Sequence, residues 1–223
     1  MTRPAFYALE SGSWRDYVTI LHLPYTAWHL SYVAIGGALS SEFSGRRLLA
    51  ALASFALALG IGAHALDELN GRPLQTRISD RVLIGLATVS VGAAVAIGIA
   101  SAFAWTPWLL VFVAVGGFLV VAYNLELFGG AFHSDLWFGL TWGSFPLLAT
   151  YFVMAEEVTL AAGLAAVFAL ATSLAQRTLS TPARDLRRRG IGEPASLPPL
   201  ERTLRLLTLS IVALAAALLS LRL

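Results

Sequence analysis

The chain has 223 residues, of which 57% are hydrophobic and 13% are charged, and its net charge is +2. Its mean hydropathy is +0.74. Because a soluble domain carries about a quarter charged residues, this composition predicts an integral membrane protein. The absence of cysteine excludes disulfides, thiolate metal sites and a cysteine nucleophile. All 15 basic residues are arginine, so the chain lacks the amine that a Schiff base with retinal or another carbonyl requires.

Apolar runs of about 20 residues, the length that crosses the hydrocarbon core of a bilayer, recur along the chain. Residues 1–16 mix polar and aromatic side chains without an apolar core, which predicts a surface segment rather than a cleavable signal peptide. Seven membrane helices are expected to follow, at residues 17–39, 48–68, 82–104, 107–125, 135–154, 158–178 and 203–221. Since lipid offers no partners to open backbone groups, they predict an all-α bundle, with 1–223 as one membrane domain. Longer polar loops are expected at 69–81, 126–134 and 179–202.

The arginines are distributed unequally between the two sides of these expected helices. The side of the N-terminus and the longer loops carries Arg3, Arg15, Arg72, Arg77, Arg81, Arg177, Arg184, Arg187, Arg188, Arg189, Arg202 and Arg205. The other side carries Arg46, Arg47 and Arg222. Because cytoplasmic loops are enriched in basic residues, we expect a multi-pass protein of the cytoplasmic membrane. Its N-terminus would be cytoplasmic and its C-terminus outside.

Histidines and carboxylates occur on the first two expected helices. His22 and His29 are seven residues apart, which is compatible with bis-histidine haem ligation or with polar positions that line a cavity. His64, Asp67 and Glu68 stand at i, i+3 and i+4, so they share one face of the second helix. Such a group can hold a divalent cation, and carboxylates suit Mg²⁺. The alternative is a helix end whose carboxylates meet water or pair with a nearby arginine.

Two polar segments follow along the chain. The stretch "NGRPLQTRISDR" is a turn that contains Arg72, and it is either part of a site or only a basic loop. The stretch "YNLELFGGAFHSDLW" contains Tyr123, Asn124 and Glu126, while Ser134 or Asp135 is placed to cap the next helix. An interfacial aromatic explains Tyr123 equally well.

A basic segment ends the sixth expected helix. The stretch "QRTLSTPARDLRRRG" contains Arg177, Arg184 and Asp185, followed by Arg187–Arg189. Guanidinium groups bind phosphate oxygens in a bidentate manner, which suits a phosphate ligand. Contact with anionic lipid headgroups is the alternative, and it is preferred for Arg187–Arg189.

The order of these stretches resembles that of the UbiA-type intramembrane prenyltransferases. The resemblance rests on "LHLPYTAWHLSYVAIGGAL", "DELNGRPLQTRISDR", "YNLELFGGAFHSDLWFGLTWGSFP" and "QRTLSTPARDLRRRG", which span about residues 17–190. It implies a helix bundle around a cavity open to the cytoplasm, where acidic motifs hold Mg²⁺ and an isoprenoid diphosphate. The chain departs from the family in having Ala63 and His64 where the first motif has acidic or amide residues. Its second motif keeps only Asp185, and about seven helices stand in place of nine.

The resemblance implies a divergent, aspartate-poor enzyme that transfers or otherwise processes an isoprenoid diphosphate, with a lipophilic acceptor as partner. The implied catalytic residues are Asp67, Glu68, Tyr123 and Asn124; the implied substrate-binding residues are Arg72, Arg177, Arg184, Asp185 and Glu126; the implied Mg²⁺ ligands are His64, Asp67 and Glu68. A non-catalytic UbiA-like lipid-binding or scaffold protein is the alternative, and a small transporter is a third. The lipid bilayer is an expected partner and nucleic acid is not.

Overall fold

A computed structural model describes residues 3–188 and 196–222, and within these residues the chain is helical and forms no strand. The elements are α1 (Trp14–Ile20), α2 (Leu23–Leu39), α3 (Gly45–Phe55), η1 (Ala56–Ala63), α4 (His64–Leu69), α5 (Asp80–Ala104), α6 (Leu109–Asn124), α7 (Leu127–Gly130), α8 (Asp135–Gly139), η2 (Leu140–Ser144), α9 (Phe145–Ala155), α10 (Leu160–Arg188) and α11 (Leu197–Ser220). The all-α prediction is therefore confirmed.

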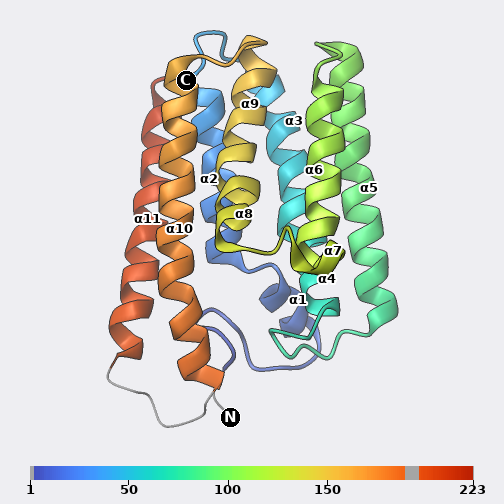
Figure 1. Cartoon of the computed structure of the whole chain (residues 1–223), viewed down its shortest axis with the longest axis vertical. Coiled ribbons are helices and arrows are strands. Elements are labelled where there is room, and N and C mark those ends of the chain that lie inside the picture. Colours follow the sequence, from blue (N-terminus) through green and yellow to red (C-terminus); the bar gives the residue numbers. More distant parts are fainter. Residues whose placement is uncertain (1–2, 189–195, 223) are drawn as a thin grey trace.

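The long helices run side by side along the long axis of the molecule, and the two termini lie at opposite ends (Figure 1). We refer to these ends as the N-terminal end and the C-terminal end. The central helix α2 contacts α9 and α11, while α5 packs against η1, α4 and α6. Two long columns, α3–η1–α4 and α8–η2–α9, each contain a π-helical segment, a wider turn that occurs frequently at functional sites.

Within the described residues, five segments are long and apolar enough to cross a membrane. They are Gly45–Leu69, Asp80–Ala104, Asp135–Ala155, Leu160–Arg188 and Leu197–Ser220. The helix α6 is apolar but has 16 residues, and α2 has 17. The multi-pass prediction is confirmed by these five segments, whereas seven spans are not confirmed. The side of the membrane on which each end lies stays a prediction.

Two predicted boundaries are wrong. The expected helix 17–39 is interrupted at His22, whose backbone is left-handed with φ +45°, so α1 and α2 are separate. The expected loop 179–202 is largely helical, because α10 continues through Pro182 to Arg188 and α11 begins at Leu197. Proline disfavours a helix interior. Here the lower turns of α10 and α11 bury Ala183, Leu197 and Leu204 together, which offsets that cost.

The bundle core is formed mainly by α2, α9, α10 and α11. Trp28, Tyr32 and Leu147 are fully buried and belong to one apolar cluster with Ala169 and Ile211. By contrast, large apolar side chains on the outer faces are exposed, as on α5 and α11, which is expected of a surface in contact with lipid.

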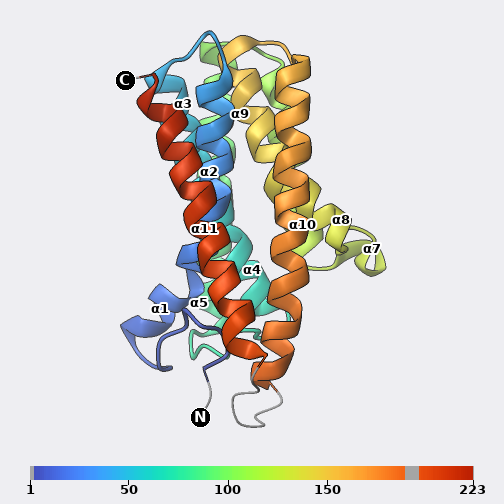
Figure 2. The ribbon, with the colours of Figure 1, turned by 90° about the vertical axis from the view of Figure 1, so that its left-hand side faces the viewer.

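The helices reach different depths at the N-terminal end. α6 rises about 24 Å and α10 about 43 Å, at 1.5 Å per residue. Because both begin near the C-terminal end, α6 stops short and the last turns of α10 extend beyond it (Figure 1). Figure 2 shows α7 and α8 to one side of the bundle, away from α11. The end of α10 thus projects past the level at which α6 ends.

Candidate functional site at the N-terminal end

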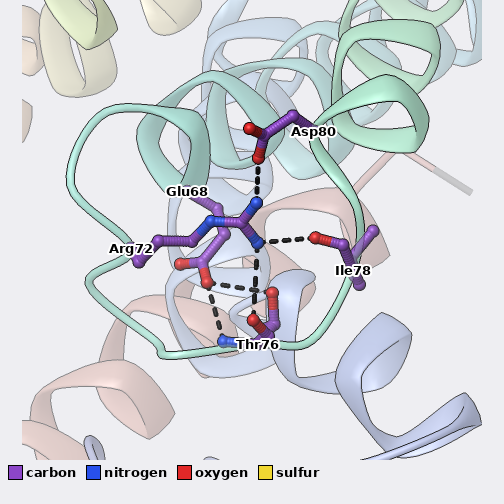
Figure 3. A network of polar contacts seen from close by, with 5 residues as sticks. All are labelled: Glu68, Arg72, Thr76, Ile78 and Asp80. Atoms are coloured by element: carbon purple, nitrogen blue, oxygen red, sulfur yellow. Dashed lines mark hydrogen bonds and ion pairs between the residues drawn. The ribbon is translucent and has the colours of Figure 1, made fainter.

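Glu68 organises the loop that joins α4 to α5 (Figure 3). Its side chain is 1% exposed. One carboxylate oxygen accepts a hydrogen bond from the Leu74 backbone N–H at 2.9 Å. The other accepts from the backbone N–H and the hydroxyl of Thr76 at 2.8 and 2.9 Å. Both oxygens of Glu68 are therefore engaged by the loop.

Arg72 closes the same loop from its outer side. Its backbone is left-handed, with φ +52°. Its guanidinium donates to the carbonyl oxygen of Ile78 at 2.6 Å and to that of Thr76 at 3.4 Å. It also forms an ion pair with Asp80, at the start of α5 (Figure 3). The predicted diphosphate ligand Arg72 is thus held by loop contacts.

A second buried carboxylate, Asp16, ties the N-terminal segment to this loop. Asp16 is 3% exposed and accepts hydrogen bonds from the backbone N–H groups of Gly12 and Arg77, both at 2.9 Å. The sequence interpretation missed Asp16, since a single acidic residue in a polar segment gives no signal of burial. The segment before α1 is therefore part of the folded N-terminal end.

Two histidine rings stack next to this docked segment. The rings of His22 and His64 lie 4.0 Å apart between centroids, with 10° between their planes. Nδ1 of His22 lies 2.9 Å from the Tyr7 hydroxyl, and Nδ1 of His64 donates to the Gly60 carbonyl oxygen at 3.1 Å. Burial, followed by the charge of His64, lowers the pKa of His22 well below its usual range. His22 is therefore neutral at neutral pH.

The predicted Mg²⁺ ligands are not brought together. Glu68 faces the loop and the His64 ring stacks on His22. Of the three predicted ligands, this leaves only the carboxylate of Asp67. Across the described ranges, no group of three or more histidine or acidic side chains could hold a metal ion. The residues present do not fit the Mg²⁺ site that the resemblance implies. The side chain of His29 is also engaged by the protein, since its Nδ1 lies 2.8 Å from the Trp142 carbonyl oxygen.

What we call the polar cluster consists of His22, Asp67, Tyr123, Gln176, Arg177 and Arg184. The charges of Arg184 and Arg177 both act on the carboxylate of Asp67 and on the hydroxyl of Tyr123. Arg184 is half-buried, and within the described part of the chain it forms no hydrogen bond or ion pair. The cluster thus contains a cation without a direct partner.

Three buried polar atoms of the polar cluster also lack hydrogen-bond partners. They are Nε2 of His22, the hydroxyl of Tyr123 and Oε1 of Gln176. Buried polar atoms are normally satisfied, and each exception in a native structure calls for an explanation such as a bound water or ligand. These three atoms come from the turn before α2, from α6 and from α10, and the charge of Arg184 acts on His22 and Tyr123. A polar ligand at this place would supply the missing partners.

Arg177 links α10 to α8. Its Nε donates to the Asp135 carboxylate at 2.9 Å, and its guanidinium lies 5.2 Å from the centre of the Phe138 ring. Of the two predicted caps, Ser134 and Asp135, it is Ser134 that caps α8, because its hydroxyl accepts from the Trp137 N–H. The terminal nitrogens of Arg177 make no hydrogen bond to any described residue. Part of this guanidinium therefore stays available to a ligand.

The remaining predicted residues have other neighbours. The side chain of Asn124 donates to the Val120 carbonyl oxygen at 2.7 Å, and the backbone carbonyl oxygen of Asn124 accepts from the side chain of Asn70 at 3.2 Å. Glu126 is exposed and lies 4.0 Å from Nε2 of His133. Asp185 is exposed on α10.

The basic stretch at the end of α10 is partly occupied. Arg187 donates to Glu201 at 2.5 Å and so joins α10 to α11. Arg188 is exposed, and Arg189 lies outside the described residues.

An elongated apolar cavity occupies the other half of the bundle, between α3–η1, α5, α6 and η2–α9. Trp142 lines it and packs edge-on against the ring of Tyr123, with 5.5 Å between ring centroids. Trp142 therefore stands between this cavity and Tyr123 of the polar cluster.

Comparisons with known proteins give no match. No family model, no curated protein and no solved structure matches the chain. The resemblance to the UbiA-type family rests only on the quoted stretches.

Proposed function

We propose that this chain binds an isoprenoid diphosphate at the polar cluster and processes it there, with arginines in the place of metal ions. The observation that carries the proposal is Arg184, a half-buried cation without an ion-pair partner among the described residues. Its charge acts on groups from four parts of the chain, namely Tyr7, Tyr25, Asp67 and Tyr123. A cation so surrounded is placed to receive an anion that enters between these segments.

The chemistry of the groups suits a diphosphate ester. Guanidinium groups form charge-assisted, bidentate hydrogen bonds to phosphate oxygens. Arg184 and the free nitrogens of Arg177 would contact the diphosphate, and the orphan donor of Tyr123 would reach a bridging or terminal oxygen. The lipid-facing apolar helices would accommodate the isoprenoid chain of a substrate that arrives from the membrane.

In the reaction we propose, the bond between the allylic carbon and the diphosphate oxygen breaks, and its electron pair leaves with the diphosphate. The arginines stabilise the charge that develops on this leaving group. A lipophilic acceptor forms the new bond to the allylic carbon and loses a proton. The carboxylate of Asp67 would accept that proton, since it is half-buried and makes no hydrogen bond to a described residue.

Binding of geranylgeranyl diphosphate to the purified protein tests the proposal. Arg184→Gln should weaken binding at least about tenfold, because a charged hydrogen bond contributes about 1.5–3 kcal/mol. Arg188→Gln is the matched control, since this exposed arginine lies one turn further along α10. Equal affinity of the two variants, or no binding by a folded wild-type protein, would overturn the proposal.

A non-catalytic lipid-binding protein is the second candidate. It is favoured by Glu68 and Arg72, whose side chains are engaged by the α4–α5 loop rather than free for chemistry. Release of inorganic diphosphate from geranylgeranyl diphosphate, in the presence of a membrane lipid extract as acceptor source, separates the two. If geranylgeranyl diphosphate binds but inorganic diphosphate is not released with any of the lipid extracts, the non-catalytic candidate is favoured.

A further inference from the structure

The apolar cavity lies in the C-terminal half of the bundle and is separate from the polar cluster. Along α6 its wall runs from Leu109 to Val120, a rise of about 16 Å. Its volume is about 120 Å³. Its walls are almost entirely apolar, so a narrow and extended hydrocarbon chain would fit it.

One hydrogen-bond donor at the outer end of the cavity is unsatisfied. Nε1 of Trp105, at the end of α5, is buried and has no partner among the described residues. An indole N–H can only donate, so what it lacks is an acceptor oxygen. The N–H of a buried tryptophan usually has a hydrogen-bond partner.

Positive charge lies next to the same indole. The guanidinium carbons of Arg46 and Arg47 are 5.8 and 5.6 Å from the centre of the Trp105 ring. Arg47 is already engaged, because it donates to the carbonyl oxygens of Val153 and Met154 at 2.8 and 3.0 Å. Arg46 is exposed and makes no hydrogen bond or ion pair with a described residue. The acceptor that Trp105 lacks is therefore best supplied by an anion.

We propose that this cavity binds a free fatty acid, a single-chain carboxylate that enters from the membrane. Its chain lies along α6, one carboxylate oxygen accepts the N–H of Trp105, and Arg46 pairs with the charge. A two-chain phospholipid is disfavoured because the cavity volume is small and only one buried donor, the N–H of Trp105, lies beside the arginines. This site is independent of the polar cluster at the opposite end.

Thr141 provides an internal check on the orientation of the chain. Its hydroxyl is buried at the inner end of the cavity and has no partner there. If the carboxylate lies at Trp105, the methyl end of the chain faces Thr141. Replacement of this hydroxyl by a methyl group, in Thr141→Val, should then leave the affinity unchanged or raise it.

The test measures binding of dodecanoate to the full chain in lipid nanodiscs, since alkyl detergents would compete for the cavity. Trp105→Phe keeps an aromatic side chain but removes the N–H, and it should weaken binding at least about tenfold. Trp108→Phe is the matched control, because Trp108 is 69% exposed and does not line the cavity. Arg46→Gln should weaken binding severalfold, whereas Arg81→Gln at the opposite end should not.

Dodecanol and dodecyl phosphate complete the experiment, and circular dichroism confirms that each variant is folded. Weaker binding of dodecanol than of dodecanoate supports the carboxylate assignment. The carboxylate assignment would be overturned if dodecanol bound as tightly as dodecanoate, or if dodecyl phosphate bound more tightly. It would also be overturned if Trp105→Phe and Trp108→Phe lost the same affinity, or if Thr141→Val lost severalfold affinity. Absence of dodecanoate binding by the folded wild-type protein would overturn it as well.

Discussion

Replacement of Glu68 by glutamine tests whether this buried carboxylate holds the α4–α5 loop. The wild-type side chain accepts three hydrogen bonds, from the Leu74 N–H and from both donors of Thr76. Glutamine keeps one acceptor oxygen. If that oxygen takes the Thr76 position, the new NH₂ group faces the Leu74 N–H, so one charge-assisted bond is lost and two donors oppose each other. We expect this to destabilise the loop by about 3 kcal/mol.

Limited proteolysis measures that opening. Trypsin can cleave after Arg77, which is exposed, whereas Pro73 protects the bond after Arg72. A loss of about 3 kcal/mol raises the population of the open loop, and thus the cleavage rate, roughly 100-fold. Glu157→Gln is the control, since Glu157 is exposed in the α9–α10 turn. Equal cleavage rates in Glu68→Gln and wild type would refute the assignment of Glu68 as the residue that holds the loop.

Three further predictions concern other parts of the fold. Asp16→Asn should release the N-terminal segment and speed cleavage after Arg77 at least about tenfold, because two backbone N–H groups lose a charged acceptor; an unchanged rate would contradict this. Acidification from pH 7 to pH 5 should lower thermal stability, because the pKa of His22 is lowered in the folded chain and the unfolded chain therefore binds more protons below about pH 6.5. His22→Asn should make thermal stability depend less on pH in this range. An unchanged pH dependence would count against the burial of this ring. Gly36→Ala should cost about 1–3 kcal/mol, because a Cβ there would lie 2.2 Å from the Leu147 carbonyl oxygen of α9. Gly163→Ala, which meets open space, should be neutral or stabilising in the same unfolding assay, and equal effects of both would refute the close packing of α2 on α9.

The helical class and the membrane character of the chain could be predicted because both follow from composition and apolar run length. The break at His22 could not, since a left-handed residue inside an apolar run leaves no periodic signal. The continuation of α10 through Pro182 could not be predicted either. It depends on packing against α11, and tertiary contacts can override the local preference of proline.

The residues of the candidate site could likewise be predicted only in part. The order of polar motifs along the expected helices placed Asp67, Tyr123, Arg177 and Arg184 on one side, and in the structure the charges of both arginines act on Asp67 and Tyr123. Spacing also grouped Glu68 with Asp67, because both share a helix face with His64 at the i+3 and i+4 positions. The loop contacts that engage Glu68 involve backbone N–H groups, and these carry no sequence signature.

The most direct test of the account is the affinity of geranylgeranyl diphosphate for wild type and Asp67→Asn, each with EDTA and with Mg²⁺. If arginines alone hold the diphosphate, the wild-type Kd should be the same within about twofold in both buffers. Asp67→Asn should then bind equally or more tightly, because it removes a negative charge beside Arg184. Binding that requires Mg²⁺ and is lost in Asp67→Asn would contradict the account and return the site to metal-dependent chemistry.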